Sequence, residues 1–112
     1  MDIKSSAFSR LGSEFTGTTV LGDAIDQEVL KRAGIERADA FVAATQGDNR
    51  NIMASQIAKH VYGVNRVVTR IYDPLRSDTF TALGLQAISP TIIGANAFYE
   101  ELTGAPASAV SI

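Results

Sequence analysis

The feature that most restricts the fold of this chain is a regular alternation of short apolar segments with longer segments of helical periodicity. The short segments are rich in β-branched and small apolar residues, and we expect strands at residues 18–21, 40–44, 66–71 and 87–89. Between and around them, apolar residues recur at helical spacing, and we expect helices at residues 5–14, 26–32, 48–62, 75–83 and 91–102. Strands that alternate with helices favour right-handed crossovers, so the sequence predicts an α/β fold with a parallel sheet and helices on both faces.

Local signals mark several boundaries and faces of these elements. Asp26 and Asp48 can cap the helices that follow them, and Gly34 and Gly63 end those helices. The segment 40–44 is continuously apolar, which is typical of a central strand covered on both faces. We expect the helix 48–62 to bury an apolar stripe made of Ile52, Met53, Ile57, Ala58, Val61 and Tyr62.

Composition limits the classes of protein to consider. With 112 residues, 46% of them hydrophobic and 20% charged, the chain can form one globular domain. The net charge of -2 is spread without a basic run, so we expect no nucleic-acid partner. Cysteine is absent, which excludes thiolate metal sites and favours a cytoplasmic location. No apolar run approaches the roughly 20 residues of a membrane span, so we expect no direct membrane insertion.

The loops that follow the predicted strands are the candidate ligand-binding segments. Doubly wound sheets bind their ligands at the carboxyl ends of the strands. Gly22 and Gly47 permit backbone conformations that are closed to other residues, while Asp23, Thr45 and Asn49 offer hydrogen-bonding groups to a ribose or an amide. Ordinary turns and helix caps use the same residue types, so a purely structural role is the alternative.

The sequence shows no pattern for catalysis or metal binding. His60, the single histidine, lies near a helix end beside Lys59, where a dipole interaction or solvation accounts for it. There is neither a metal-spaced cluster of histidines and carboxylates nor a Gly-x-Ser-x-Gly turn. Arg70 ends an apolar strand and is either directed at the ligand crevice or solvated. We therefore expect no catalytic residue and no metal.

Several motifs together resemble the TrkA-N domain, also called the RCK domain, which regulates potassium channels and transporters. Residues 22–26, Gly-Asp-Ala-Ile-Asp, are similar to the family's Gly-Asp-Ala-Thr-Asp signature, with Ile25 in place of Thr. The family's pattern continues in the same order at residues 33–45, 48–51, 66–70, 73–74 and 88–91. The resemblance runs from Phe8 to about Ala97, and we expect a domain at 1–103 and a flexible tail at 104–112.

The resemblance implies a Rossmann-like fold that binds NAD or ATP and dimerises. Asp23 and Ala24 would lie by the adenine, Thr45 and Gln46 would line the crevice, and Arg70 would face the phosphates. Asn51 would sit at the start of the helix below the ligand, and Asp2 would hold the ribose hydroxyls unless the terminus is disordered. The expected binding residues are Asp2, Gly22, Asp23, Ala24, Thr45, Gln46, Asp48, Asn51 and Arg70.

One part of the family's pattern has no match in these residues. The family opens with a strand, a Gly-x-Gly-x-x-Gly turn, a helix and a second strand, of which only Asp2 finds a counterpart. In the strand order 3-2-1-4-5-6, the missing strands would lie between segments 18–21 and 40–44. The expected fold is therefore N-terminally incomplete: the two segments pair directly, strands are borrowed from another copy, or the chain is a piece of a longer protein. Because a dinucleotide's pyrophosphate rests on the glycine-rich turn, we expect weak or absent nucleotide binding.

These observations predict a non-enzymatic, cytoplasmic regulatory domain of a potassium transport system. It would be peripheral to the inner membrane through a membrane-embedded channel or transporter subunit, and would form a homo-oligomer. One alternative is a fragment of an NAD-dependent oxidoreductase or epimerase, which needs a catalytic Tyr, Lys or His that the segment 45–47 does not supply. Another is an oligomerising interaction module without ligand binding.

Overall fold

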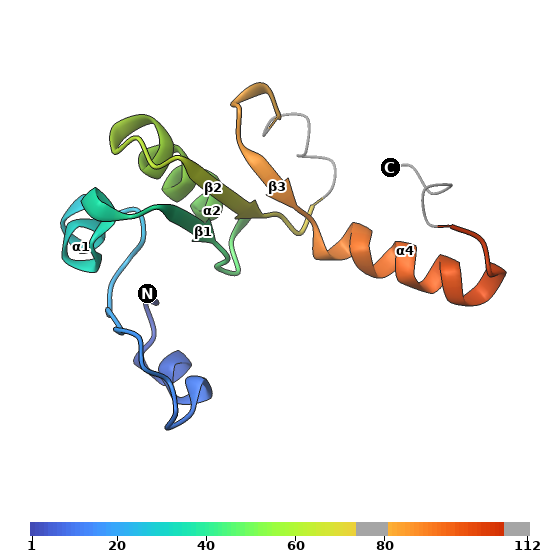
Figure 1. Ribbon diagram of the computed structural model, residues 1–112, viewed down its shortest axis with the longest axis horizontal. Coiled ribbons are helices and arrows are strands. Elements are labelled where there is room, and N and C mark those ends of the chain that lie inside the picture. The colour runs from blue at the N-terminus through green and yellow to red at the C-terminus, as the bar shows by residue number, and fades with distance from the viewer. Residues whose placement is uncertain (74–80, 107–112) are drawn as a thin grey trace.

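The computed structural model describes residues 1–73 and 81–106, and its centre is a parallel sheet. The strands β1 (Ala40–Ala43), β2 (Arg66–Arg70) and β3 (Gln86–Ile88) lie in the order β1-β2-β3 (Figure 1). In this register Phe41 pairs with Val67, and Thr69 pairs with Ala87. All three strands lie within one residue of their predicted bounds, which confirms the parallel α/β arrangement.

The helices also begin and end near their predicted positions. These are α1 (Gln27–Ala33), α2 (Asp48–Gln56), which continues as the π-helical turn η3 (Ile57–Val61), and α4 (Pro90–Thr103), together with the short 3-10 turn η2 (Ile35–Arg37). As predicted, Asp26 Oδ1 caps α1 by accepting a hydrogen bond from Glu28 N (3.0 Å), and Gly34 ends the helix with a φ of 95°. Most of the helix predicted at 75–83, and most of the tail predicted at 104–112, lie outside the described residues.

The N-terminal segment differs from the prediction in two places. In place of a helix at 5–14, the chain forms a 3-10 helix, η1 (Ser5–Leu11), that buries no residue. The strand predicted at 18–21 is reduced to one parallel bridge between Leu21 and Asp2, in which Gly22 N donates to Asp2 O at 2.9 Å. A strand needs a neighbouring strand to satisfy its backbone groups, and Asp2 supplies that partner at one position only.

The strand β1 lies at the edge of the described sheet, so the prediction of a central strand is wrong for these residues. It pairs with β2 on one side, and Val42 is 65% exposed. Among the described residues, segment 18–21 does not close the gap by pairing with β1. The sheet is therefore incomplete, as the sequence predicts.

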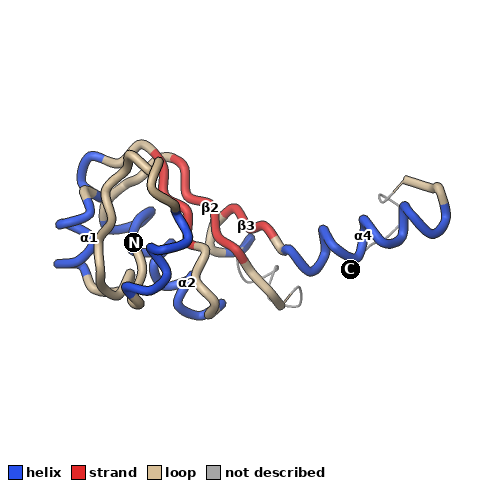
Figure 2. Tube along the Cα trace, turned by 90° about the horizontal axis from the view of Figure 1, so that it is seen from below, coloured by secondary structure: helices blue, strands red, loops and turns tan. Residues whose placement is uncertain are grey.

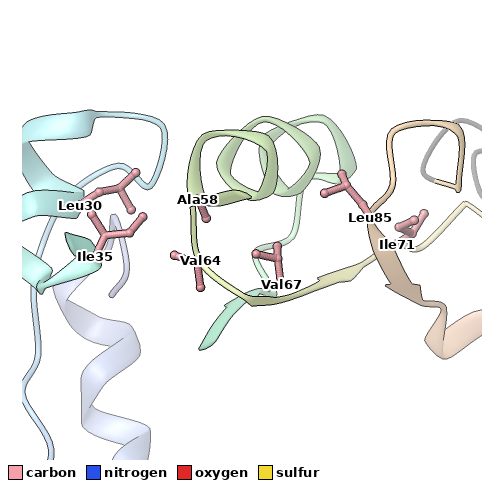
Figure 3. Close-up of a cluster of buried hydrophobic side chains, with 7 residues drawn as sticks. All are labelled: Leu30, Ile35, Ala58, Val64, Val67, Ile71 and Leu85. Carbon is pink, nitrogen blue, oxygen red and sulfur yellow. The ribbon is translucent and has the colours of Figure 1, made fainter. Parts of the chain in front are cut away.

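The hydrophobic core lies where α1 and the α2–η3 helix pack with β2 and the segments around it (Figure 3). Its buried members are Leu30, Ile35, Ala58, Val64, Val67, Ile71 and Leu85. The apolar stripe predicted for 48–62 is only partly right, because Met53 and Val61 are exposed while Ala54 and Ser55 are buried. The small side chains of Ala54, Ser55 and Ala58 on the inner face let the helix backbone lie close to the strands.

The helix α4 leaves the core and extends away from the sheet (Figures 1 and 2). None of its residues is buried. The radius of gyration of the chain is accordingly 16.1 Å, whereas a compact domain of this length has about 13 Å. Neither α4 nor any other helix in the described ranges has the combination of length and apolar character needed to cross a membrane.

Candidate functional site

Asn51 joins the carboxyl ends of β1 and β2. It lies in the first turn of α2 and has no exposed surface (0%). Its Oδ1 accepts hydrogen bonds from Thr45 N (2.8 Å) and Thr45 Oγ1 (2.6 Å), and its Nδ2 donates to Thr45 O (3.0 Å) and Arg70 O (2.9 Å). A primary amide can make about four such bonds, so the hydrogen-bonding capacity of Asn51 is used within the chain. Asn51 therefore fixes the loop after β1 to the last residue of β2.

The guanidinium of Arg70 lies against the end of β1. Its Nη2 donates to Ala44 O (2.5 Å) and Thr45 O (3.1 Å), and its central carbon lies 4.9 Å from the centre of the Tyr72 ring. The buried Nε has no hydrogen-bond partner among the described residues. Arg70 thus places a positive charge at the carboxyl edge of the sheet, held by backbone carbonyls and an aromatic ring.

Asp48 connects the start of α2 to the chain that leaves β2. Its Oδ1 accepts from Tyr72 N (2.8 Å) and its Oδ2 accepts from Asp73 N (3.0 Å). The helix-capping role predicted for Asp48 is wrong, because Gly47 occupies the N-cap position and Asp48 is already helical. Tyr72 was not among the predicted site residues. Its position directly after an apolar strand indicates a loop residue at the carboxyl edge of the sheet. Its contacts could not be predicted, because Asp48 and Thr91 are distant from it in the sequence.

The loop after segment 18–21 is tied to α2 by an ion pair. Asp23 Oδ2 lies 3.6 Å from Arg50 Nη2, and Asp23 Oδ1 accepts from Ile25 N at 3.2 Å. The half-buried Ala24 lies in the same turn and contributes only a methyl group. Arg50 was not among the predicted site residues, although it lies in the segment 48–51 that follows the family's pattern.

Gly22 and Gly47 do not adopt the unusual backbone conformations predicted for them. Neither has a positive φ, and Gly47 is extended, with φ -106° and ψ 120°. Position 22 requires glycine for a steric reason, because an added Cβ would lie 2.5 Å from Val29 Cγ1. The glycine at position 22 therefore permits close packing of this loop on α1.

Asp2 is held by the chain near it. Its Oδ1 accepts a hydrogen bond from Lys4 N (2.9 Å), and its backbone forms the bridge to Leu21. This bridge places Asp2 beside the loop that begins at Gly22. The alternative of a disordered terminus is not what the structure shows for this residue.

An open hollow of about 300 Å³ lies over the loop after β1 and the exit from β2. It is lined by Gln46, Gly47, Asp48, Asn49, Tyr72 and Asp73. Of the predicted site residues, Gln46 and Asp48 face this hollow, whereas Thr45, Asn51 and Arg70 are joined to one another at the strand ends. No group of three or more His, Cys, Asp or Glu side chains in the described ranges could hold a metal ion.

Comparison with known proteins assigns this arrangement to a family. The family model of the TrkA-N domain matches residues 1–90. The chain belongs to the TrkA-N domain family. Over 89 residues it is 44% identical to the Trk system potassium uptake protein TrkA of Streptomyces coelicolor, covering 80% of this chain and 40% of that protein. Over 93 residues it is 37% identical to the TrkA homolog of Pyrococcus abyssi, covering 78% of this chain and 41% of that protein.

A solved RCK domain and a solved channel structure are also similar to this TrkA-N chain. The GsuK RCK domain superposes with a TM-score of 0.72 at 27% identity, covering 83% of this chain and 21% of that chain. The GsuK channel superposes with a TM-score of 0.71 at 27% identity, covering 83% and 25%. These neighbours confirm the Rossmann-like class. The chain spans about two fifths of the length of the two uptake proteins.

Proposed function

We propose that this chain is a regulatory domain of a potassium transport system that senses NAD or ATP at the carboxyl ends of β1 and β2. The observation that carries the proposal is the match to the TrkA-N domain over residues 1–90, joined to 44% identity with a potassium uptake protein. Such a domain acts by shifting the populations of two arrangements, which a membrane-embedded channel or transporter subunit then reads. This role places the chain on the cytoplasmic side of the inner membrane and assigns it no catalysis.

The proposed site divides into residues that contact the ligand and residues that position them. Asp23 and Ala24 contact the adenine, Asp2 contacts the ribose hydroxyls, and Thr45 and Gln46 line the crevice. Gly22 keeps its loop close to α1, where an added Cβ would collide with Val29. Asp48 and Asn51 act through other groups, because their polar atoms already bond within the chain.

Phosphate binding is the weak part of this site. The 112 residues contain no Gly-x-Gly-x-x-Gly turn, whose N–H groups hold the pyrophosphate in this fold. Two or three lost hydrogen bonds to a charged group forfeit roughly 3 to 9 kcal/mol. A micromolar site then weakens to about millimolar at best. Arg70 offsets part of this loss by pairing with a phosphate, but Asp23 and Thr45 can hold an adenosine without the missing turn, so the chain prefers adenosine to its phosphates.

Calorimetric titration of the 112-residue chain with adenosine, NAD and ATP tests this function. We expect millimolar adenosine binding, weaker NAD binding, and micromolar NAD binding after a strand, glycine-rich turn and helix are supplied at the N-terminus. Asp23→Ala should abolish the adenosine signal, while Glu28→Gln in the first turn of α1 is the matched control on an exposed carboxylate. Micromolar NAD binding by the 112 residues alone would contradict the weak phosphate site. No binding by the extended version would contradict nucleotide sensing.

A second candidate function, an oligomerising module without ligand binding, is favoured by α4. Its Phe98 and Leu102, one helical turn apart, are 74% and 84% exposed, which is unusual for two neighbouring large apolar side chains. A stable oligomer whose dissociation constant does not respond to adenosine, NAD or ATP would support this alternative.

A further inference from the structure

Tyr72 contacts three separate parts of the molecule. Its N–H donates to Asp48 Oδ1 (2.8 Å), at the first residue of α2. Its carbonyl oxygen accepts from Thr91 Oγ1 (2.8 Å), in the first turn of α4. Its ring lies 4.9 Å from the guanidinium carbon of Arg70, at the end of β2. The backbone and the ring of a single residue therefore link the open hollow at the strand ends with α4, the helix that leaves the core.

We propose that Tyr72 couples the loop after β1 to α4, so that a change in one alters the stability of the other. The regulatory meaning of this coupling rests on the proposed function, because α4 then carries the state of the crevice outward. The coupling itself requires neither a nucleotide nor a partner. It can be measured on the chain alone.

At the open hollow, Tyr72 is held by strong hydrogen bonds, and these lie where a ligand would bind. Asp48 lines the open hollow and uses both carboxylate oxygens on the N–H groups of Tyr72 and Asp73. Hydrogen bonds to an ionised group are about twice as strong as neutral ones. Arg70 reaches the same loop by another route, since it donates to Thr45 O while it stacks on the Tyr72 ring. Movement of the loop after β1 must therefore disturb Tyr72.

The α4 end of the link is sensitive because, among the described residues, few contacts hold this helix to the rest of the chain. No residue of α4 is buried, so its direction depends on the contacts at its first turn (Figure 1). Among the described residues, these contacts include the bond from Thr91 Oγ1 to Tyr72 O and the N-cap bond from Ile92 N to Ser89 Oγ (3.3 Å), while β3, just before the helix, is held by the ladder bond from Ile71 N to Ile88 O (2.9 Å). Elements with few buried contacts open at low free energy, so one lost bond produces a measurable change.

Amide hydrogen exchange on the full chain tests the crevice end of the coupling. In Asp48→Asn, one oxygen becomes an N–H₂ group that faces a donor, and exchange at Tyr72 and Asp73 should rise about 10-fold or more. We expect exchange at Ile92 and Ile93, in the first turn of α4, to rise about 3-fold with it. Glu28→Gln is the matched control, since it removes a first-turn carboxylate of α1 that bonds to Lys31 rather than to Tyr72. It should leave all four amides at their original rates.

Substitution of Thr91 tests the link from its other end. Thr91→Val keeps the shape of the side chain but removes the hydroxyl, and exchange at Tyr72 and Asp73 should rise, because coupling is reciprocal. Thr91→Ser keeps the hydroxyl and should restore the original rates. Thr91→Val also decides the question if Asp48→Asn fails to fold.

The proposal is overturned if each substitution acts only on its own side. In that outcome Asp48→Asn speeds exchange at Tyr72 and Asp73 while Ile92 and Ile93 keep their rates, and Thr91→Val affects α4 alone. Effects on both sides without any response of α4 to added adenosine would support the coupling and contradict nucleotide sensing. The two proposals therefore fail in different measurements.

Discussion

The helices α2 and α4 reverse the usual relation between apolar content and burial. The sequence of α2, Asp-Asn-Arg-Asn-Ile-Met-Ala-Ser-Gln, is mostly polar, yet Asn51, Ala54 and Ser55 are buried. Ile92, Ile93, Phe98 and Leu102 make α4 the more apolar helix, yet no residue of it is buried. Side-chain polarity alone does not tell which helix packs on the sheet.

The difference between the two helices lies in the partners that each one has. Asn51 makes four hydrogen bonds to the ends of β1 and β2, and Ser55 Oγ accepts from Thr69 Oγ1 at 2.6 Å. Burial of these polar groups is tolerated because each of them is hydrogen-bonded. By contrast, α4 carries an exposed apolar surface of the kind that marks a protein interface, which favours self-association.

Two phenylalanines give the largest expected contrast between the core and α4. Phe41 is half-buried in β1 and packs against the core, so Phe41→Asp places an unpaired charge there and should cost more than about 4 kcal/mol. Circular dichroism melts should show no cooperative transition. Phe98→Asp is the control on α4 and, at a concentration where the chain is monomeric, should leave the melting temperature almost unchanged. A soluble, cooperatively melting Phe41→Asp variant would contradict the placement of the core.

Two asparagines test whether hydrogen bonding explains the burial of α2. Asn51→Ala removes four hydrogen bonds at the strand ends, although Thr45 O keeps its bond from Arg70, and should lower the free energy of unfolding by about 3 kcal/mol. Asn96→Ala in α4 should not lower it, since Asn96 Oδ1 is buried without a hydrogen-bond partner among the described residues and its removal loses no hydrogen bond. Denaturation in urea measures both. Equal losses in the two variants would contradict the comparison.

Self-association tests the surface of α4. We expect the chain to form oligomers at micromolar concentration, and we expect Phe98→Asp to raise the dissociation constant about 10-fold or more by placing a charge in the interface. Sedimentation velocity measures both proteins, with His60→Ala as a control on an exposed residue outside α4. A compact monomer at these concentrations would show that the apolar face of α4 has another role.

Two threonines give the smallest expected contrast. Thr69→Val removes the hydroxyl that donates to the buried Ser55 and should cost about 1 kcal/mol. Thr103→Val removes an exposed hydroxyl that donates to Tyr99 O at the end of α4, and should cost less than about 0.5 kcal/mol. Thermal unfolding of the two variants compares these values. A larger loss for Thr103→Val would mean that the end of α4 contributes to the stability of the fold.

Local signals in the sequence were enough to predict the three strands, the bounds of α1 and the family. The apolar run of β1, the β-branched run of β2, Asp26 at the start of α1 and Gly34 at its end act through neighbours a few residues away. Such short-range effects are visible in a linear sequence. The same holds for the ordered motifs that resemble the TrkA-N domain, because they need no knowledge of how the segments meet.

Only the tertiary structure decided the roles of particular residues. Segment 18–21 has strand-forming residues but forms a single bridge, because a strand depends on a distant partner for its hydrogen bonds. Asp48 resembles a cap in the sequence, yet its carboxylate bonds to Tyr72 and Asp73, more than twenty positions away. The inner face of α2 was likewise determined by the polar groups that β1 and β2 present to it. Side-chain roles at this site depend on long-range contacts, whereas the order of the elements depends on local ones.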